Sequence, residues 1–471
     1  MELREKELDS KPKKKREMPN AFVILLFMMF IAMLATWFVP AGQFEREEGP
    51  EGRMIVVPGS FQETESTPVG IFGMLEAIPN GLADAAMISM TILIIGGTWA
   101  VLNQSGAITS GVGSLAKKLG KSEMLIIPIM MIIFSTIAAF IGALELAIVY
   151  VPVMIVLARA LRLDNMTAVA MSLVATGGAF SASLTNPFTV GLGQQIVGLP
   201  LYSGIGYRLI VLLVFVSIGI AYVMWYAIRV RKNPKNSLVY DENNDQNQES
   251  VEFLEPKKEH KLIWILLIAA FGTITYGVLK LGWYLYEIGA IFFALALLSA
   301  VIGRISLNSM TETFVKGAQG VLLAALVVGL ARSILIIIEN GQIIDTISLG
   351  LVNMIQGMPQ FIMPVGFFIS QAFLNFVVNS GSGQVLLTMP ILSPVAELVG
   401  ITQQTTVLAT QLGDGITNLV FPVSGVLMGC LAFANVSFIK WLKFIMPLVI
   451  IWMLLGSVFL VIAQMIHWGP F

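Results

Sequence analysis

The chain has 471 residues, of which 56% are hydrophobic and 12% are charged, and its mean hydropathy is +0.83. A soluble globular protein carries about 25% charged residues, so this composition excludes a soluble protein and predicts an integral membrane protein. The net charge of -1 without a basic patch excludes a nucleic-acid partner, and one cysteine with two distant histidines excludes a metal site.

Apolar runs recur along the whole chain. A transmembrane helix needs about 20 apolar residues, and the runs of that kind cover residues 20–40, 84–104, 166–197, 207–228, 262–279, 284–303, 319–339, 404–430 and 444–466. Two further apolar stretches, 123–161 and 360–398, are about twice as long as one span. The first run follows a basic tail at residues 1–19 and lacks a small-residue cleavage pattern, so it predicts an anchor helix and not a signal peptide.

The distribution of Lys and Arg predicts the orientation, because cytoplasmic loops are enriched in these residues. With the N-terminus inside, 23 of the 28 basic residues fall in cytoplasmic segments. Arg46, Arg53, Arg208 and Lys280 fall outside, and Arg332 falls within a span. We therefore expect the N-terminus inside and the C-terminus outside.

The chain divides into two membrane halves. An external loop is expected at 41–80, a first repeat at 81–228 and a second at 262–471, with a polar cytoplasmic linker at 229–261. Each half contains a double-length apolar stretch followed by a helix that polar residues interrupt, which indicates an internal repeat. The topology count makes the repeats inverted, which is typical of secondary transporters that bind substrate between the halves.

The double-length stretches predict re-entrant helical hairpins at 123–161 and 360–398. The first has its polar interruption at Gly142 to Glu145, and the second has Asn379-Ser-Gly-Ser-Gly-Gln384. These tips are too short to be loops in water, and irregular backbone at membrane depth is tolerated only beside protein or a wet cavity. The alternatives are two full spans joined by a tight turn, or small residues at a helix contact.

Two helices are predicted to be broken. Pro187 interrupts the helix at 166–197, and the helix at 404–430 carries Gly413-Asp-Gly415 and Pro422. A broken helix leaves free amides on one half and free carbonyls on the other, which suit an anion and a cation, respectively. The sequence therefore predicts an all-α polytopic membrane protein with two inverted repeats, about nine spans, two re-entrant hairpins and two broken helices.

Charged side chains inside the membrane are functional candidates. Glu145, Asp414 and Arg332 are the deep ones, whereas Glu76, Asp84 and Glu397 could reach an interface. The alternatives are that Arg332 is a structural partner of Asp414 or Glu145, and that helix caps hold both acids. We predict a substrate site formed by Gly142, Glu145, Ser183, Thr185, Asn186, Asn379, Ser380, Gly381, Ser382, Gly383, Asp414, Thr417 and Asn418. Glu145, Arg332 and Asp414 are the candidates for charge compensation or for a coupling ion, Na+ or H+.

Nine motifs are spread over nearly the whole chain. They are Pro40-Ala-Gly42, Val57-Pro-Gly-Ser-Phe61, the Gly142 to Glu145 tip, Thr185-Asn-Pro-Phe188, Pro200-Leu-Tyr-Ser-Gly204, Gly329-Leu-Ala-Arg332, Asn379-Ser-Gly-Ser-Gly383, Gly413-Asp-Gly415 and Thr417-Asn418. Together they resemble the YfcC-like branch of the four-carbon dicarboxylate anaerobic carrier family. The resemblance implies the ion-transporter superfamily architecture, a homodimer in the bacterial inner membrane, and an elevator mechanism. It implies no enzyme activity and no cofactor beyond a coupling ion.

The substrate class is open between two interpretations. The family name implies a four-carbon dicarboxylate with Na+ or H+, whereas some relatives in this branch resemble arginine/ornithine exchangers. This chain lacks the Ser-Asn-Thr tips of the superfamily's symporters, and two deep acids against one Arg disfavour a dianion. We therefore expect a small amino acid, basic or zwitterionic. An intramembrane hydrolase with Ser382 as nucleophile lacks a histidine base in the membrane core, and a passive channel is the remaining alternative.

Overall fold

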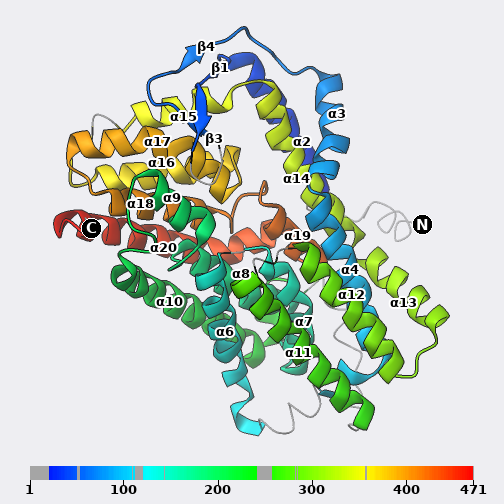
Figure 1. Cartoon of the computed structure of the whole chain (residues 1–471). Coiled ribbons are helices and arrows are strands. Elements are labelled where there is room, and N and C mark those ends of the chain that lie inside the picture. Colours follow the sequence, from blue (N-terminus) through cyan, green and yellow to red (C-terminus); the bar gives the residue numbers. More distant parts are fainter. Residues whose placement is uncertain are drawn as a thin grey trace, which may run out of the picture.

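The computed structural model describes residues 21–49, 54–108, 110–111, 120–142, 144–240, 257–281, 283, 285–355 and 358–469. The basic tail at 1–19, Ala143 at the first predicted tip and residues 241–256 of the predicted linker lie outside the described residues. The described residues form a mostly helical protein with 18 α-helices (Figure 1).

Seven helices of the described part are long and apolar enough to cross a membrane, by length and composition. They are Ala86–Gln104, Glu123–Ile141, Ile205–Lys232, Leu285–Ile302, Leu322–Asn340, Gly381–Val399 and Phe438–Met465. Three shorter apolar helices are Phe22–Phe38, Leu146–Ala160 and Met363–Val377. The protein is therefore a polytopic membrane protein, and the figure of about nine spans stays a prediction.

The segment that follows the first helix contains more structure than the loop predicted at 41–80. After α2 (Ala21–Phe38), two short antiparallel pairs join β1 (Gly42–Gln43) to β4 (Gln62–Glu63) and β2 (Arg46–Glu48) to β3 (Met54–Val56). Helix α3 (Ile71–Asp84) then precedes α4 (Ala86–Gln104). Pro79 and three glycine or asparagine residues weaken the helical signal of α3 in the sequence, and packing against α14 (Leu322–Asn340) overrides it.

The remainder of the first half is a helix pair, an interrupted helix and a long helix. A 3-10 turn, η2 (Gly120–Leu125), leads into α6 (Ile126–Ile141) and α7 (Leu146–Ala160). Helix α8 (Asn165–Ser181) ends before a π-helical turn, η3 (Pro187–Gly191), and α9 (Leu192–Ile196). The 28-residue α10 (Ile205–Lys232) and the turn η4 (Pro234–Asn236) complete this half.

The second half repeats this order of elements. It begins with α11 (Lys258–Leu281), α12 (Leu285–Ile302), α13 (Leu307–Gly320) and α14, followed by α15 (Ile344–Asn353). The helix pair is α16 (Met363–Val377) and α17 (Gly381–Val399), and the interrupted helix is α18 (Gln403–Thr417) with α19 (Gly425–Phe433). The 28-residue α20 (Phe438–Met465) follows. The inverted relation of the halves and the re-entrant depth of both pairs stay predictions.

Helix packing separates two groups that meet along one seam. The frame, by which we mean α2, α3, α4, α12, α13 and α14, packs mainly within itself and lies along the right of Figure 1. The central bundle, by which we mean α6 to α10 and α16 to α20, holds both helix pairs and both interrupted helices. The two groups meet where α14 packs against α19 and α4 against α7.

Candidate functional site

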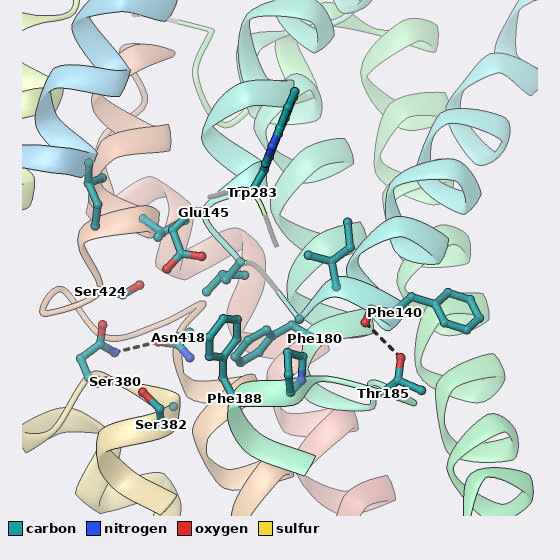
Figure 2. A pocket seen from close by; sticks show the side chains of 18 of the residues that line it. Phe140, Glu145, Phe180, Thr185, Phe188, Trp283, Ser380, Ser382, Asn418 and Ser424 are labelled. Atoms are coloured by element: carbon teal, nitrogen blue, oxygen red, sulfur yellow. Dashed lines mark hydrogen bonds between the residues drawn. The ribbon is translucent and has the colours of Figure 1, made fainter. Parts of the chain in front are cut away.

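A cavity of about 950 Å³ lies where the helix ends of the central bundle face the frame. Both helix-pair tips and both helix interruptions contribute to its wall, and Ile88 and Arg332 line it from the frame. Figure 2 shows Glu145 above and Ser382 below in the cavity, with the rings of Phe180 and Phe188 to the right of both.

The first tip is fixed against the first interruption. Gly142 ends α6 in the left-handed region with φ 70°, and a Cβ atom at this position would lie 2.2 Å from Cγ of Asn186. Only glycine satisfies both conditions without strain. The hydroxyl of Thr185 donates to the carbonyl of Phe140 at 3.0 Å, which joins the same two segments. Glu145 is the N-cap residue of α7, and it lines the cavity.

The first interruption is organised by Asn186. Its Oδ1 accepts hydrogen bonds from the amides of Phe188 at 2.9 Å and Thr189 at 3.3 Å, which caps the helical segment that begins at Pro187. Its Nδ2 and the hydroxyl oxygen of Thr189 are buried and have no hydrogen-bond partner in the described part of the chain. A buried polar atom without a partner is costly, so these atoms mark a place where a ligand atom would be stabilised.

The second tip crosses the second interruption. Asn379 donates to Oδ1 of Asn418 at 2.7 Å, and Ser380 caps α17 by accepting from the amide of Gly383 at 3.3 Å. Gly381 lies against Asp414, because a Cβ atom on Gly381 would be 3.1 Å from Oδ2 of that carboxylate. The hairpin tip and the helix break therefore form one surface.

Asp414 is a buried acid with few hydrogen bonds to its carboxylate. The residue is 1% exposed, and its Oδ1 receives only a long hydrogen bond of 3.4 Å from Nδ2 of Asn418. Its Oδ2 is buried without a hydrogen-bond partner among the described residues. A buried carboxylate oxygen without a partner favours a cation beside it.

Three helix N-termini face the cavity through Glu145 (α7), Gly381 (α17) and Ser424 (α19). Helix N-termini carry free amides and partial positive charge, which suit a carboxylate. The cavity thus combines donors for an anionic group with acids for a cationic group.

The predicted site residues divide into two sets. Gly142, Glu145, Thr185, Asn379, Ser380, Gly381, Ser382, Asn418 and Arg332 line the cavity. Ser183, Asn186, Gly383, Asp414 and Thr417 lie behind that wall as supporting residues. The hydroxyl of Thr417 is already engaged, because it accepts from Nδ2 of Asn375 at 2.8 Å and donates to the carbonyl of Gly413 at 2.7 Å.

Arg332 pairs with a residue other than the two acids considered for it in the sequence. Its Nε donates to Oδ2 of Asp84, at the end of α3, so the pair belongs to the frame. A second cavity of about 240 Å³ is lined by Asp84, Arg332 and Glu145, and it shares Arg332 and Glu145 with the larger one. Sequence reasoning placed Asp84 toward an interface because nothing in the local pattern indicates its partner 248 residues away.

Arg208, which the distribution of basic residues places toward the outside, is fully buried in α10. Its Nη1 donates to Oε1 of Gln411, whose Nε2 donates to the hydroxyl of Ser183 at 2.9 Å. Gln411 thereby joins the two interrupted helices. The basic residue alone could not reveal this role, but Gln411 stands one turn before Asp414 on α18, which was an available signal.

Aromatic residues of the cavity wall were also missed. Phe180, Phe188, Tyr202 and Trp283 line it (Figure 2 labels all but Tyr202). They come from three separate segments of the chain, and no sequence spacing relates them to one another.

A helical membrane protein with interrupted helices and helix pairs around a central cavity has the features of a secondary transporter. The chain matches the family model described as C4-dicarboxylate anaerobic carrier (DcuC) over residues 18–465. It belongs to this family, which is a family of transporters and not of enzymes.

Two relatives match nearly end to end. The "Putative basic amino acid antiporter YfcC" of Escherichia coli (strain K12) is 33% identical over 497 residues, covering 97% of this chain and 98% of that protein. An "Uncharacterized protein" of Haemophilus influenzae is 27% identical over 505 residues, covering 97% of this chain and 99% of that protein.

Two solved transporters are similar at low identity. YdaH of Alcanivorax borkumensis has 15% identity and a TM-score of 0.41, and the match covers 96% of this chain and 100% of that chain. MtrF of Neisseria gonorrhoeae has 15% identity and a TM-score of 0.41, and the match covers 96% of both chains. Both likenesses are too weak to place residues.

Proposed function

We propose that the protein exchanges basic amino acids across the bacterial cytoplasmic membrane. The observation that carries this proposal is Oδ2 of Asp414, a buried carboxylate oxygen in the last turn of α18, which lies directly behind Gly381 of the second tip and has no hydrogen-bond partner among the described residues. An ionised carboxylate in such a place needs a compensating cation. The Escherichia coli relative is named "Putative basic amino acid antiporter YfcC", which agrees with basic amino acids as the substrate class.

The charge balance of the site supports a cationic substrate. Glu145 and Asp414 come from the central bundle, whereas Arg332 is bound to Asp84 of the frame. The guanidinium of Arg208 donates to Gln411 and not to either acid. A substrate with one net positive charge compensates the acids directly, and its replacement by a second molecule of equal charge needs no coupling ion.

The cavity has a place for each part of an amino acid. The α-carboxylate would lie at the N-termini of α17 and α19, near Gly381 and Ser424. The methylene chain would contact the rings of Phe180 and Phe188, and the cationic end would lie near Glu145 or Asp414. Burial of the methylene groups between aromatic rings supplies apolar binding free energy, while the helix ends and acids supply orientation.

An elevator mechanism fits the two helix groups. The central bundle contains every element that forms the two tips and the two helix breaks, so it can move as the unit that carries substrate. Its α19 presents Gly425 and Gly429 to Val328 of α14, and glycines one helical turn apart give a smooth contact surface. We propose that the bundle slides against the frame along this surface, and that the protein is a homodimer with its N-terminus inside and its C-terminus outside.

A second candidate function is uptake of a four-carbon dicarboxylate with Na+ or H+. It is favoured by the family description and by two oxygen atoms that have no hydrogen-bond partner among the described residues, Oδ2 of Asp414 and Oγ1 of Thr189. Both residues lie beside Gly381, and oxygen atoms are the type of ligand that Na+ binds. A dianion at this site would need at least two accompanying cations to balance its own charge.

Counterflow in proteoliposomes distinguishes the two. Vesicles preloaded with ornithine or arginine are expected to accelerate uptake of labelled arginine, with no effect of a Na+ gradient and little effect of succinate or fumarate. If succinate or fumarate drives Na+-dependent counterflow and the basic amino acids do nothing, the dicarboxylate function replaces the exchange function. Conduction without counterflow would indicate a channel.

A further inference from the structure

The frame carries a charged pair at the seam that it shares with the central bundle. Arg332 lies in the middle of α14, and its Nε donates to Asp84 at the end of α3. The Arg332 and Asp84 side chains are 36% and 46% exposed, although the neighbouring residues Ala331 and Ser333 are buried. Both side chains line the 240 Å³ cavity between frame and bundle, which accounts for their exposure.

The pair is not needed to hold α3 against α14. Gly81 packs so closely on α14 that a Cβ atom there would lie 2.6 Å from the carbonyl oxygen of Gly329, and Gly329 packs equally closely on Leu82. Exposed ion pairs add little stability. The position of Arg332 therefore calls for another explanation.

That explanation comes from the opposite wall of the cavity. Glu145 lines it from the bundle, and both Glu145 and Arg332 also line the larger cavity. A guanidinium has five N–H donors in a planar fork. The structure shows this fork on Asp84, so pairing with Glu145 would mean exchange of one carboxylate for the other, and Glu145 belongs to the part that moves.

Arg332 lies next to the proposed sliding surface between α14 and α19. Val328 contacts Gly425 and Gly429 of α19, and Arg332 follows Val328 by one helical turn on α14. Glu145 belongs to the central bundle with α19, since it is the N-cap residue of α7 and α7 packs against α19. Movement of α19 along α14 therefore carries Glu145 relative to Arg332.

We propose that Arg332 is a positioning residue that retains the unloaded bundle by pairing with Glu145, which makes the carrier an obligate exchanger. A bound cationic side chain takes the place of Arg332 at Glu145, Arg332 returns to Asp84, and the loaded bundle crosses. Asp84 competes with Glu145 for the guanidinium and so sets the strength of retention. This inference rests on the proposed exchange of basic amino acids.

The test separates net efflux from exchange. Proteoliposomes loaded with labelled arginine are diluted into buffer without substrate, which measures efflux, or with external arginine, which measures exchange. The wild type is expected to exchange rapidly and to lose little label into empty buffer. Arg332→Gln is expected to raise efflux about tenfold while exchange changes less than about threefold, since only the unloaded return step loses its barrier. Arg332→Lys keeps the charge and should keep the coupling.

Asp84→Asn is expected to act in the opposite direction. Without its competitor, Arg332 holds Glu145 more strongly, so exchange slows severalfold and efflux stays low. Arg304→Gln is the matched control, since it removes an exposed arginine of the frame away from both cavities. An unchanged ratio of efflux to exchange in Arg332→Gln would overturn the proposal and leave the pair a structural feature.

A second measurement does not depend on the substrate. Cysteines at Val328 and Gly429, in a Cys430→Ser background, should form a disulfide in the register described here, because Cγ2 of Val328 lies 3.4 Å from the Cβ position of Gly429. Without substrate, Arg332→Gln is expected to slow this cross-linking severalfold. If it does so while the wild type exchanges no basic amino acid, retention stands and the proposed substrate fails. If cross-linking is unchanged, retention fails.

Discussion

Gly381 at the tip of the second helix pair lies against Asp414 in the last turn of α18, where a Cβ atom on the glycine would be 3.1 Å from Oδ2 of the carboxylate and 2.9 Å from Cγ2 of Thr189. The tip therefore covers a buried acid that no described side chain satisfies through Oδ2. Gly381 and Asp414 are 33 residues apart in sequence, and their contact joins the helix pair of the second repeat to its interrupted helix.

Gly381→Ala is expected to impair transport while the protein still folds. The added methyl group meets Thr189 at 2.9 Å and stands beside Asp414, so it forces the tip away from the acid. Overpacking of this kind costs about 1–3 kcal/mol, which corresponds to a loss of apparent affinity of about 5-fold to 150-fold. Counterflow at several arginine concentrations measures the change. Gly350→Ala on α15, where a Cβ atom meets nothing within 4 Å, is the control. Equal affinity in both variants would separate Gly381 from the site.

The two acids are expected to be required individually. Glu145→Gln and Asp414→Asn remove the charge with little change in shape, and each should reduce exchange to below about a tenth of the wild-type rate, because the compensation of the substrate cation is lost. Fluorescence size-exclusion profiles at matched expression report whether the variants fold.

Asp345→Asn is the control for the loss of a buried acid. Asp345 lies outside the cavity, where it accepts from the amide of Phe44 at 2.9 Å and from Nη2 of Arg46 at 3.0 Å. It should affect stability more than transport. Normal uptake by both Glu145→Gln and Asp414→Asn would make the two acids structural.

Local sequence signals predicted most of the helices but not their partners. Pro187 and Pro422 indicated where the two helices are interrupted, since proline acts on the backbone within one turn. The expected break at Gly413-Asp-Gly415 was wrong, because these residues stay helical in α18, where packing overrides the low helix propensity of glycine. The partners of the charged residues could not be predicted, because Arg332 meets Asp84 and Arg208 meets Gln411 across more than 200 residues. The same limit explains why Thr417 was assigned to the substrate although Asn375 occupies its hydroxyl.

The wall of the cavity is expected to be reached by water-soluble reagents. Single cysteines at Ser380 and Ser382, in a Cys430→Ser background, should react with a small hydrophilic thiol reagent, and saturating substrate should slow the reaction, since both residues line the cavity. Ser172→Cys is the control, because Ser172 is fully buried in α8 and makes no part of the wall. If both tip cysteines were inert under all conditions, the re-entrant interpretation of this helix pair would be abandoned in favour of plain spans.

The bridge through Gln411 is expected to couple stability to transport. Its Oε1 accepts from the buried guanidinium of Arg208, and its Nε2 donates to the hydroxyl of Ser183 at 2.9 Å and to the carbonyl of Ser183 at 3.0 Å. Gln411→Met keeps the volume but leaves the Arg208 guanidinium without its acceptor. Removal of one partner from a buried charged group costs about 3–5 kcal/mol, so the melting temperature should fall by several degrees.

The second substitution identifies the cause of that loss. Arg208→Met removes the buried charge itself, and the double variant Arg208→Met with Gln411→Met should recover part of the stability lost in Gln411→Met, because no unpaired cation remains. Thermal unfolding of the purified variants measures this coupling, which should reach about 0.5–3 kcal/mol for two residues in contact. If the two stability losses were additive, Gln411 would act only through its hydrogen bonds to Ser183. Exchange activity should then fall in Gln411→Met and stay unchanged in Arg208→Met.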